Sequence, residues 1–314
     1  MATAILDLEL TGLPASIPVP GEYGHALVLV RFKGDPVGQV RLPVRDGRIG
    51  DDSVPLPVEL ARNCDAVLWS RWAGVRFGAG SPPPDHLPSV TTAVCTRDRP
   101  EDLERCLQAI SRLDPKPDAV IVVDNAPSSD ATRLLVAQHP GVRYVREDRP
   151  GLDAARNRAL REVTTEIVAF TDDDAMPDPR WLGALLPDFR DPGVLCVTGL
   201  TLAAELETEA QEVFEFASGF GRGFRRRTFS WLNQNPFAVG AVGAGVNMAL
   251  RRKVVTLVGE FDEALDAGTP TRSGGDHAMF TAILTAGYEI VYEPRALTRH
   301  RHRRSRKELL DAIH

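Results

Sequence analysis

The sequence predicts an α/β fold: a mostly parallel sheet with helices on both faces, preceded by a small β-rich N-terminal domain. From residue 90 onward, short apolar runs alternate with segments of helical spacing, the pattern of repeated βαβ units. Before residue 81, apolar runs are separated by turn residues, which is typical of β-structure. A proline run, Pro82 to Pro84, lies between the two parts.

The N-terminal part, residues 1–80, is expected to be an accessory domain. Strands are predicted over 25–32 and 37–43, and the aromatic side chains of Trp69, Trp72 and Phe77 are expected to cover the sheet face. No cluster of catalytic side chains is visible here, so docking or homo-oligomer formation is the expected role. Because proline cannot donate to a helix or a sheet ladder, residues 81–88 are expected to be a stiff linker.

The second part, residues 89–314, supplies the βα alternation. Strands are expected over 90–96, 119–124, 142–146 and 166–170. Helices are expected from Pro100, over 130–138 and over 154–162. Asp153 is the expected N-cap of the last of these helices. Parallel strands in this order bring their carboxyl ends to one edge of the sheet, where α/β proteins bind ligands.

The amino-acid composition narrows the classes of protein to which this chain can belong. The formal net charge of −6 over 314 residues argues against a general nucleic-acid binder. Four cysteines without a CxxC spacing indicate buried thiols in a reducing, cytoplasmic compartment. No apolar run has the length of a membrane helix, and the N-terminus lacks the basic residues of a signal peptide. The last residues, 309–314, fall inside an expected helix, an ending that fits a chain cut short.

Three consecutive carboxylates, Asp172 to Asp174, directly follow the buried strand 166–170. Like charges at a strand end repel one another, so folding alone gives no reason for them. A hard divalent cation such as Mg²⁺ or Mn²⁺ binds carboxylate oxygens together with phosphate oxygens, which makes this segment a candidate metal–diphosphate site. The alternative is an acidic turn with an Asp helix cap, because Pro177 and Pro179 follow.

Two other strand ends carry polar residues that suit a nucleotide. Thr96, Arg97 and Arg99 follow the first strand, and Asp124 ends the second, where it could accept from a ribose or a base. Arg156, near the start of a helix, could meet phosphate charge. Each of these residues could instead be an ordinary turn or helix-cap residue. The prediction of a nucleotide site therefore depends on the order in which they occur together along the chain.

This order of motifs resembles the family-2 glycosyltransferases, which have the GT-A fold. The resemblance covers residues 89–314, and its pieces are Thr96-Arg97-Asp98-Arg99-Pro100, Val122-Val123-Asp124-Asn125, Gly151-Leu152-Asp153-Ala154-Ala155-Arg156-Asn157, Phe170-Thr171-Asp172-Asp173-Asp174, Gly274-Gly275-Asp276 and His300-Arg301-His302-Arg303. Chains of this family often continue beyond the point at which this one stops.

The resemblance implies roles for individual residues. Asp172 and Asp174 would hold Mn²⁺ or Mg²⁺ on the donor diphosphate, with His300 the best match for a further ligand and His302 the second. The remaining donor-site residues would be Thr96, Arg97, Arg99, Asp124, Arg156 and Asp173. For both histidines the alternative is a solvated position in a basic segment.

The resemblance also implies that Asp276 is the general base that deprotonates the acceptor hydroxyl, so that the anomeric configuration inverts. The alternative is that Asp276 caps the helix that follows it. Many relatives carry an acidic residue just before this Asp, where this chain has Gly275. The glycine-rich stretch 237–248 would line the donor-sugar and acceptor cleft, or would be a tightly packed buried strand.

The expected function is therefore inverting transfer from a nucleotide sugar, with UDP as the expected nucleotide. The alternatives are a nucleotidyltransferase and a non-catalytic nucleotide-sugar or carbohydrate-binding protein. The acceptor could be a saccharide, a lipid-linked molecule or a small molecule. Two basic runs, 222–227 and 299–307, could bind diphosphate, an anionic acceptor or the inner membrane surface. The alternative is a solvated basic face, which is the expectation for residues 303–307.

Overall fold

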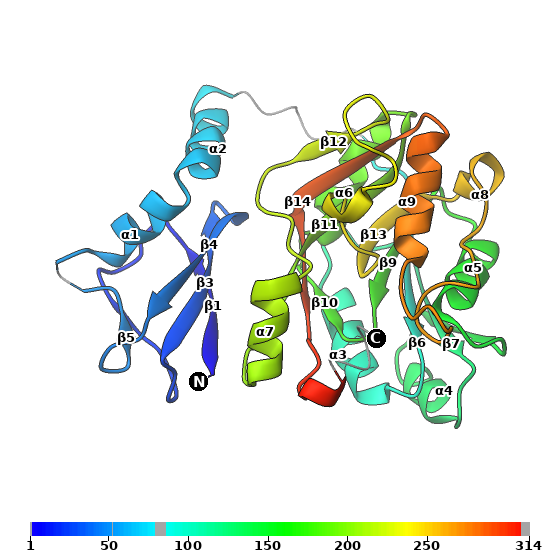
Figure 1. The fold of residues 1–314 in the computed structure, drawn as a ribbon, viewed down its shortest axis with the longest axis horizontal. Coiled ribbons are helices and arrows are strands. Elements are labelled where there is room, and N and C mark those ends of the chain that lie inside the picture. Colours follow the sequence, from blue (N-terminus) through cyan, green and yellow to red (C-terminus); the bar gives the residue numbers. More distant parts are fainter. Residues whose placement is uncertain (1, 52, 79–85, 309–314) are drawn as a thin grey trace.

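The computed structural model describes residues 2–51, 53–78 and 86–308. A nine-stranded sheet lies between helices, and a smaller unit built on a three-stranded sheet precedes it in the chain (Figure 1). The expected α/β fold and the small N-terminal sheet are both confirmed. Of the expected linker, only residues 86–88 are described, and they are irregular. The terminal segment 309–314 lies outside the described residues.

The large sheet has the strand order β10-β14-β11-β13-β9-β6-β7-β8, and β12 pairs with β14 outside this path. Its strands are β6 (Val90–Thr96), β7 (Ala119–Asn125), β8 (Val142–Glu147), β9 (Ile167–Asp172), β10 (Ala175–Pro177), β11 (Val194–Ala203), β12 (Arg227–Phe229), β13 (Asn247–Arg251) and β14 (Glu289–His300). Strands β6 to β9, β11 and β14 run in one direction, and β10, β12 and β13 run in the other. The sheet is therefore mostly parallel, as expected.

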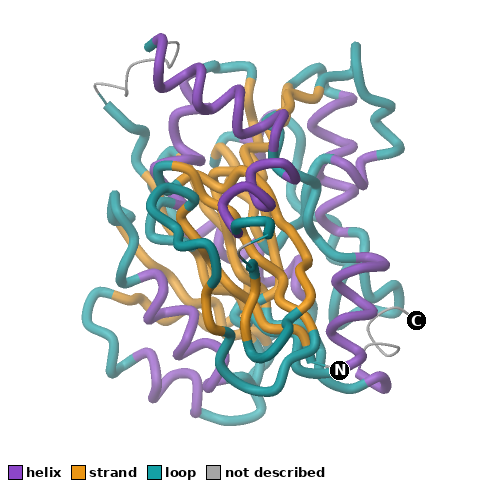
Figure 2. Tube along the Cα trace, turned by 90° about the vertical axis from the view of Figure 1, so that its left-hand side faces the viewer, coloured by secondary structure: helices purple, strands orange, loops and turns teal. Residues whose placement is uncertain are grey.

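Helices cover both faces of this sheet (Figure 2). Apolar side chains of α3 (Pro100–Ile110), α4 (Ala131–Val136), α6 (Trp181–Leu185) and the 3₁₀ helix η1 (Leu186–Arg190) form one core layer. Those of α5 (Leu152–Glu162), α8 (Val254–Leu257), α9 (Gly275–Thr285) and the 3₁₀ helix η2 (Val239–Ala241) form the other. A further helix, α7 (Glu209–Ser218), lies between the large sheet and the N-terminal unit (Figure 1).

All four cysteines are buried, in agreement with the expectation from their spacing. None of the helices in the described ranges is both long and apolar enough to cross a membrane.

One expected helix start is wrong. Asp153 does not cap α5, because the helix begins at Leu152, two residues before the expected start. Its N-cap is Gly151, whose φ of 127° is unfavourable for a residue with a side chain. Asp153 instead lies in the first turn, where its carboxylate is buried and paired with Arg156.

The N-terminal unit contains β1 (Thr3–Glu9), β3 (His25–Phe32) and β4 (Asp35–Pro43), the short pair β2 (Ile17–Pro18) and β5 (Arg48–Ile49), and two helices, α1 (Leu56–Asn63) and α2 (Asp65–Phe77). The two strands expected here are confirmed, whereas the helices were not expected. Leu56 and Leu60 of α1 pack in the core of this unit. Trp69, Trp72 and Phe77 lie on α2 and are exposed, so the expectation that they cover the sheet is wrong.

Strand β3 is buried on both faces, which joins the two parts of the molecule. Val28 and its alternate neighbours face the core of the N-terminal unit. Leu29 points the other way and packs with Leu200, Leu202 and Leu297 of the large sheet's β11 and β14. The alternation follows from the two-residue period of a strand, and burial of both faces explains the uninterrupted apolar run in the sequence.

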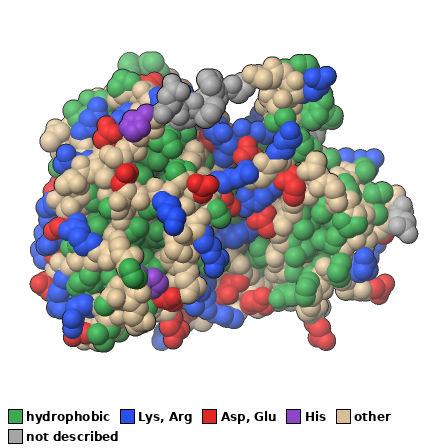
Figure 3. All heavy atoms as spheres, turned by 180° about the vertical axis from the view of Figure 1, so that it is seen from behind, with side chains coloured by type: hydrophobic (Ala, Val, Ile, Leu, Met, Phe, Trp, Pro, Cys, Tyr) green, Lys and Arg blue, Asp and Glu red, His purple; other side chains and the backbone are tan. Residues whose placement is uncertain are grey.

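Ion pairs reinforce this junction. Arg31 of β3 contacts Asp178 at 2.7 Å, and Arg299 of β14 contacts Asp7 of β1 at 3.0 Å. Figure 3 shows basic and acidic side chains gathered along the junction on this side of the molecule. The N-terminal unit is thus docked on its own chain, against the strand that ends at His300.

Candidate active site

The acidic cluster lies where β9 ends and the chain turns into β10. Asp172 is the last residue of β9, and β10 pairs antiparallel with β14 so that Ala175 lies opposite His300. This register brings His300 Nε2 to 3.1 Å from Asp174 Oδ1. Strand pairing therefore builds the cluster from two segments that are far apart in the sequence.

Asp172, Asp174 and His300 each offer one ligand atom, and these atoms lie within 4.8 Å of one another. We call these three residues the acidic trio. Among the described residues, none donates a hydrogen bond to the carboxylate of Asp172. Two carboxylates and one imidazole, close together and with ligand capacity to spare, fit a hard or borderline divalent cation such as Mg²⁺ or Mn²⁺.

The electrostatics of the trio also fit a cation. Burial raises the pKa of Asp172, and the neighbouring Asp174 raises it further. Burial also acts to raise the pKa of Asp174, but His300 and then Arg99 outweigh it, and that pKa lies well below its usual range. For His300, burial acts to lower the pKa, and the two carboxylates more than compensate and raise it. The carboxylates thus depend on nearby positive charge to stay ionised.

Asp173 lies apart from the trio. Thr96 Oγ1 donates to its Oδ2 at 2.7 Å, and Arg99 Nη1 lies 3.3 Å from its Oδ1. Arg99 Nη1 also lies 3.2 Å from Asp174 Oδ2. Three residues expected to hold the donor, Thr96, Arg99 and Asp173, are therefore joined to one another beside the trio.

His302 is close to the trio but has other partners. Its Nδ1 lies 2.9 Å from His300 Nδ1, and its Nε2 lies 2.9 Å from Glu215 Oε2. Burial lowers the pKa of His302, which favours the neutral ring. The structure brings His300, and not His302, into the group of candidate ligand atoms.

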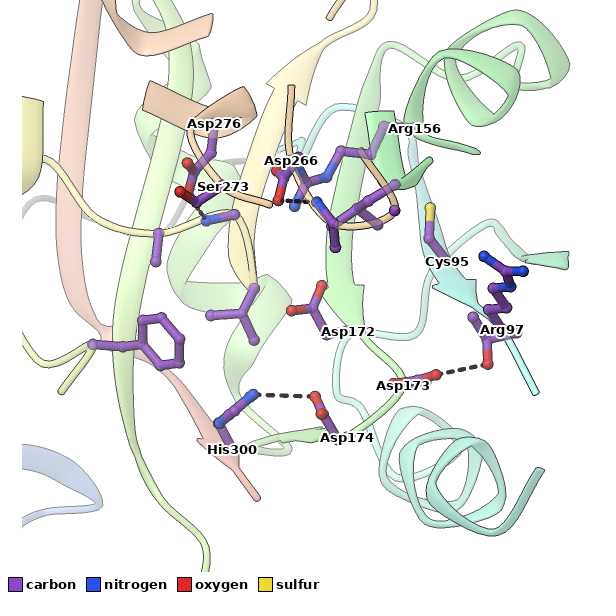
Figure 4. A pocket seen from close by; sticks show the side chains of 18 of the residues that line it. Cys95, Arg97, Arg156, Asp172, Asp173, Asp174, Asp266, Ser273, Asp276 and His300 are labelled. Carbon is purple, nitrogen blue, oxygen red and sulfur yellow. Dashed lines mark hydrogen bonds and ion pairs between the residues drawn. The ribbon is translucent and has the colours of Figure 1, made fainter. Parts of the chain in front are cut away.

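Asp276 faces the same pocket from the start of α9. The N-cap of this helix is Gly274, so the alternative that Asp276 is the cap is not what the structure shows. The backbone N–H groups of Gly245 and His277 donate to its two carboxylate oxygens, at 2.7 and 2.8 Å. In Figure 4, Asp276 lies at one end of the labelled side chains, Asp174 and His300 lie at the other, and Asp172 is between them.

The space around residue 275, directly before Asp276, explains why this position carries a glycine. A Cβ atom at Gly275 would overlap Oδ2 of Asp153, which is fully buried. That oxygen has no hydrogen-bond partner among the described residues, and burial raises the pKa of Asp153 to about 6. The carboxylate of Asp153 thus occupies the space into which a side chain at 275 would project.

Arg156 lies between these carboxylates. Its Nη1 contacts Asp153 at 2.9 Å and Asp266 at 2.7 Å, and its side chain is almost fully buried. The guanidinium lines the pocket, but protein carboxylates already balance its charge. Sequence reasoning missed Asp266, because it lies in a loop that carries no recognisable motif.

The pocket has a volume of about 720 Å³. The expected site residues that line it are Thr96, Arg97, Arg99, Arg156, Asp172, Asp173, Asp174, Asp276, His300 and His302. The glycine-rich stretch contributes residues 243–246, as expected for a cleft wall, and continues into strand β13. Asn125, Asp266 and Ser273 also line the pocket and were not expected. Asn125 follows directly after the expected Asp124 and could have been suggested by it.

Asp124 is the one expected site residue that does not line the pocket. Its side chain is fully buried, and Tyr144 donates to its Oδ2 at 2.9 Å. Its Oδ1 has no hydrogen-bond partner among the described residues.

Within each basic run, some side chains line the pocket and others do not. Arg222 and Arg303 line the pocket. Other members pair with the protein's own carboxylates: Arg226 with Asp188, Arg299 with Asp7, Arg301 with Asp102 and Glu205, and Arg304 with Glu205. Much of the positive charge in these runs is therefore neutralised by carboxylates of the same chain.

Solved structures share this architecture. One is GalNAc-T7 with UDP, GalNAc and Mn²⁺, with a TM-score of 0.55 and 14% identity over 70% of this chain and 45% of that one. Another is the mannosyltransferase PcManGT from Pyrobaculum calidifontis with GDP-Man and Mn²⁺, with a TM-score of 0.51 and 24% identity over 77% of this chain and 66% of that one. At these identities the similarity shows the GT-A fold.

Two named relatives are similar in sequence. The pre-mycofactocin glycosyltransferase of Mycobacterium tuberculosis (strain CDC 1551 / Oshkosh) is 27% identical over 274 residues, which cover 86% of this chain and 54% of the relative. The glycosyltransferase AglE of Haloferax volcanii is 27% identical over 214 residues, which cover 66% of this chain and 64% of the relative. The chain spans about half the length of the first relative.

The model of the family described as "Glycosyl transferase family 2" matches residues 91–256, more than half of the chain. The matched region contains the strand ends that carry Thr96, Asp124 and the acidic cluster. This chain belongs to glycosyl transferase family 2.

Proposed function

We propose that this chain transfers a sugar from a nucleoside diphosphate sugar to an acceptor hydroxyl, with a divalent cation and with inversion at the anomeric carbon. UDP is the proposed nucleotide, and the cation is Mn²⁺ or Mg²⁺. The observation that carries this proposal is one pocket with the acidic trio on one side and Asp276 on the other. A diphosphate bound at the trio would place the sugar between the cation and the carboxylate.

Each part of the pocket has a chemical role in this proposal. Asp172, Asp174 and His300 would hold the cation, which supplies positive charge to the departing diphosphate. Asp276 takes the proton from the acceptor hydroxyl at a carboxylate oxygen, while the N–H groups of Gly245 and His277 keep that carboxylate in place. Attack from the face opposite the departing diphosphate inverts the configuration.

Release of nucleoside diphosphate from UDP- and GDP-linked sugars tests this proposal. We expect release from one donor in Mn²⁺ or Mg²⁺ and none in EDTA. The Asp276→Asn variant should retain donor binding within a few-fold, while kcat falls by about 10²–10⁴, the usual contribution of a positioned general base. Near wild-type turnover in this variant would exclude Asp276 as the base.

The same assay separates the other candidate classes. Tight donor binding without turnover, with every acceptor class tested, would indicate a non-catalytic nucleotide-sugar-binding protein. Pyrophosphate release from a nucleoside triphosphate and a sugar phosphate would indicate a nucleotidyltransferase. Either result would overturn the proposed transfer reaction.

A further inference from the structure

A short chain of hydrogen bonds leads away from the acidic trio into the protein. His300 Nδ1 lies 2.9 Å from His302 Nδ1, and His302 Nε2 lies 2.9 Å from Glu215 Oε2. The side chain of His302 is 1% exposed and that of Glu215 is 7% exposed, so water does not compete for these contacts. Glu215 lies on α7, well away in the sequence from both histidines.

Only one arrangement of protons satisfies this chain when His300 binds a cation. Its Nε2 faces Asp174, so the lone pair on Nε2 is the one available to the cation, and the ring proton is on Nδ1. His302 Nδ1 must then accept, which leaves the proton of His302 on Nε2. That N–H donates to Glu215, which accepts as a carboxylate.

The surrounding side chains hold both rings in this orientation. Phe214 packs against the ring of His302 with centroids 4.6 Å apart, and Phe220 packs against that of His300 at 5.0 Å. Gln211, one turn before Glu215 on α7, donates from Nε2 to the backbone oxygen of His302 at 3.2 Å. The start of α7 is itself fixed by a capping box between Thr208 and Gln211.

We propose that Glu215 and His302 are positioning residues for the cation site, which hold His300 in the tautomer and orientation that present Nε2 to the cation. This inference rests on the proposed function of the acidic trio. In this proposal His302 orients His300, which binds the cation. The sequence instead suggested that His302 itself is a second-choice ligand. Groups that accept from the free nitrogen of a metal-binding histidine fix its orientation and raise its basicity.

Titration of the protein with Mn²⁺ alone, without nucleotide or acceptor, tests this proposal. Calorimetry or the electron paramagnetic resonance signal of free Mn²⁺ gives Kd. Glu215→Leu should weaken Mn²⁺ binding by about 10–100-fold, the usual cost of removing such a partner. Glu215→Gln keeps a neutral acceptor and should cost less. Glu209→Leu, which changes an exposed residue of the same helix, is the control and should leave Kd unchanged.

Two results would overturn this inference in different ways. If the wild type binds Mn²⁺ and Glu215→Leu binds it equally well, the positioning role is wrong and the proposed function stands. If the wild type binds no Mn²⁺, even with a nucleoside diphosphate present, the proposed cation site fails and this inference fails with it.

A second measurement does not depend on any variant folding correctly. Nitrogen-15 NMR of the histidine rings in the metal-free wild type reports which ring nitrogen carries the proton. We expect His302 to be protonated on Nε2 and bare on Nδ1. The opposite tautomer would contradict the proposed chain of hydrogen bonds.

Discussion

At the scale of single residues, the contact between Gly275 and Asp153 can be tested by adding one methyl group. Gly275→Ala would force a Cβ into Oδ2 of Asp153, and overpacking of this kind costs about 1–3 kcal/mol of stability. Gly74→Ala is the matched control: Gly74 is also helical but has open space around its Cβ position, so the change should be neutral or stabilising. Chemical denaturation measures both.

The cost at Gly275 should depend on the Asp153 side chain. In an Asp153→Ala background, Gly275→Ala should lose most of its effect, which gives a coupling energy in a double-mutant cycle. Equal costs in both backgrounds would show that the carboxylate does not fill this space.

Asp153 should also leave a signature in the pH dependence of stability. Burial raises its pKa in the folded protein to about 6, above the value of an unfolded chain. The folded state then binds the proton more tightly, so this group's contribution is fully present below about pH 4 and is lost as pH rises to about 6. As pH rises over this range, the free energy of unfolding of Asp153→Asn should fall by about 1–3 kcal/mol less than that of the wild type. Denaturation curves of both proteins between pH 4 and 7 measure the difference, and parallel curves would contradict the assignment.

Sequence reasoning found the residues that lie in motifs and missed those that act through tertiary contacts. Asp172, Asp174 and Asp276 stand out because carboxylates at strand ends or after two glycines need an explanation. Asp153 looked like an N-cap, because its burial beneath Gly275 depends on where α9 packs. Glu215 is one of many helical glutamates until α7 places it against His302.

At the scale of elements, strand β3 joins the N-terminal unit to the large sheet. Leu29 is fully buried and packs with Leu200, Leu202 and Leu297 across the junction. Leu29→Ala should therefore cost about 2–5 kcal/mol, as for other large-to-small changes in a core.

The exposed Val58→Ala in α1 is the control and should change stability by less than about 0.5 kcal/mol. Thermal and chemical unfolding of both variants measure the difference. A small cost at Leu29 would show that the two parts are not packed together in solution.

The apolar runs predicted most strands of the large sheet, because buried parallel strands read as continuous hydrophobic stretches. Strands β10 and β12 have three residues each and give no period to detect. Yet β10 carries the pairing that sets His300 beside Asp174. The helices α1 and α2 were missed because turn residues and short runs around them suggested β-structure alone.

At the scale of the whole molecule, the pocket and the N-terminal unit are built from different parts of the chain. Every residue that lines the pocket lies between Cys95 and Arg303. A chain that starts at residue 86 should therefore bind Mn²⁺ and nucleoside diphosphate with Kd within about tenfold of the full chain. It should be less stable, because the leucines that face β3 become exposed.

Calorimetric titration of the folded fragment, with its thermal midpoint, checks both parts of this prediction. A folded fragment without binding would show that the N-terminal unit shapes the site. Contacts from β1 and β4 to Glu212 on α7 would be the first route to examine.

The central claim is that Asp172, Asp174 and His300 bind the cation that the transfer needs. The most direct measurement is a crystal structure of the full chain with Mn²⁺ and UDP, recorded with anomalous data near the manganese edge. We expect one strong anomalous peak bonded to Asp172, Asp174, His300 and the UDP diphosphate, with Asp276 across the pocket. A peak bonded to other residues, or no peak at saturating Mn²⁺ and UDP, would contradict the claim.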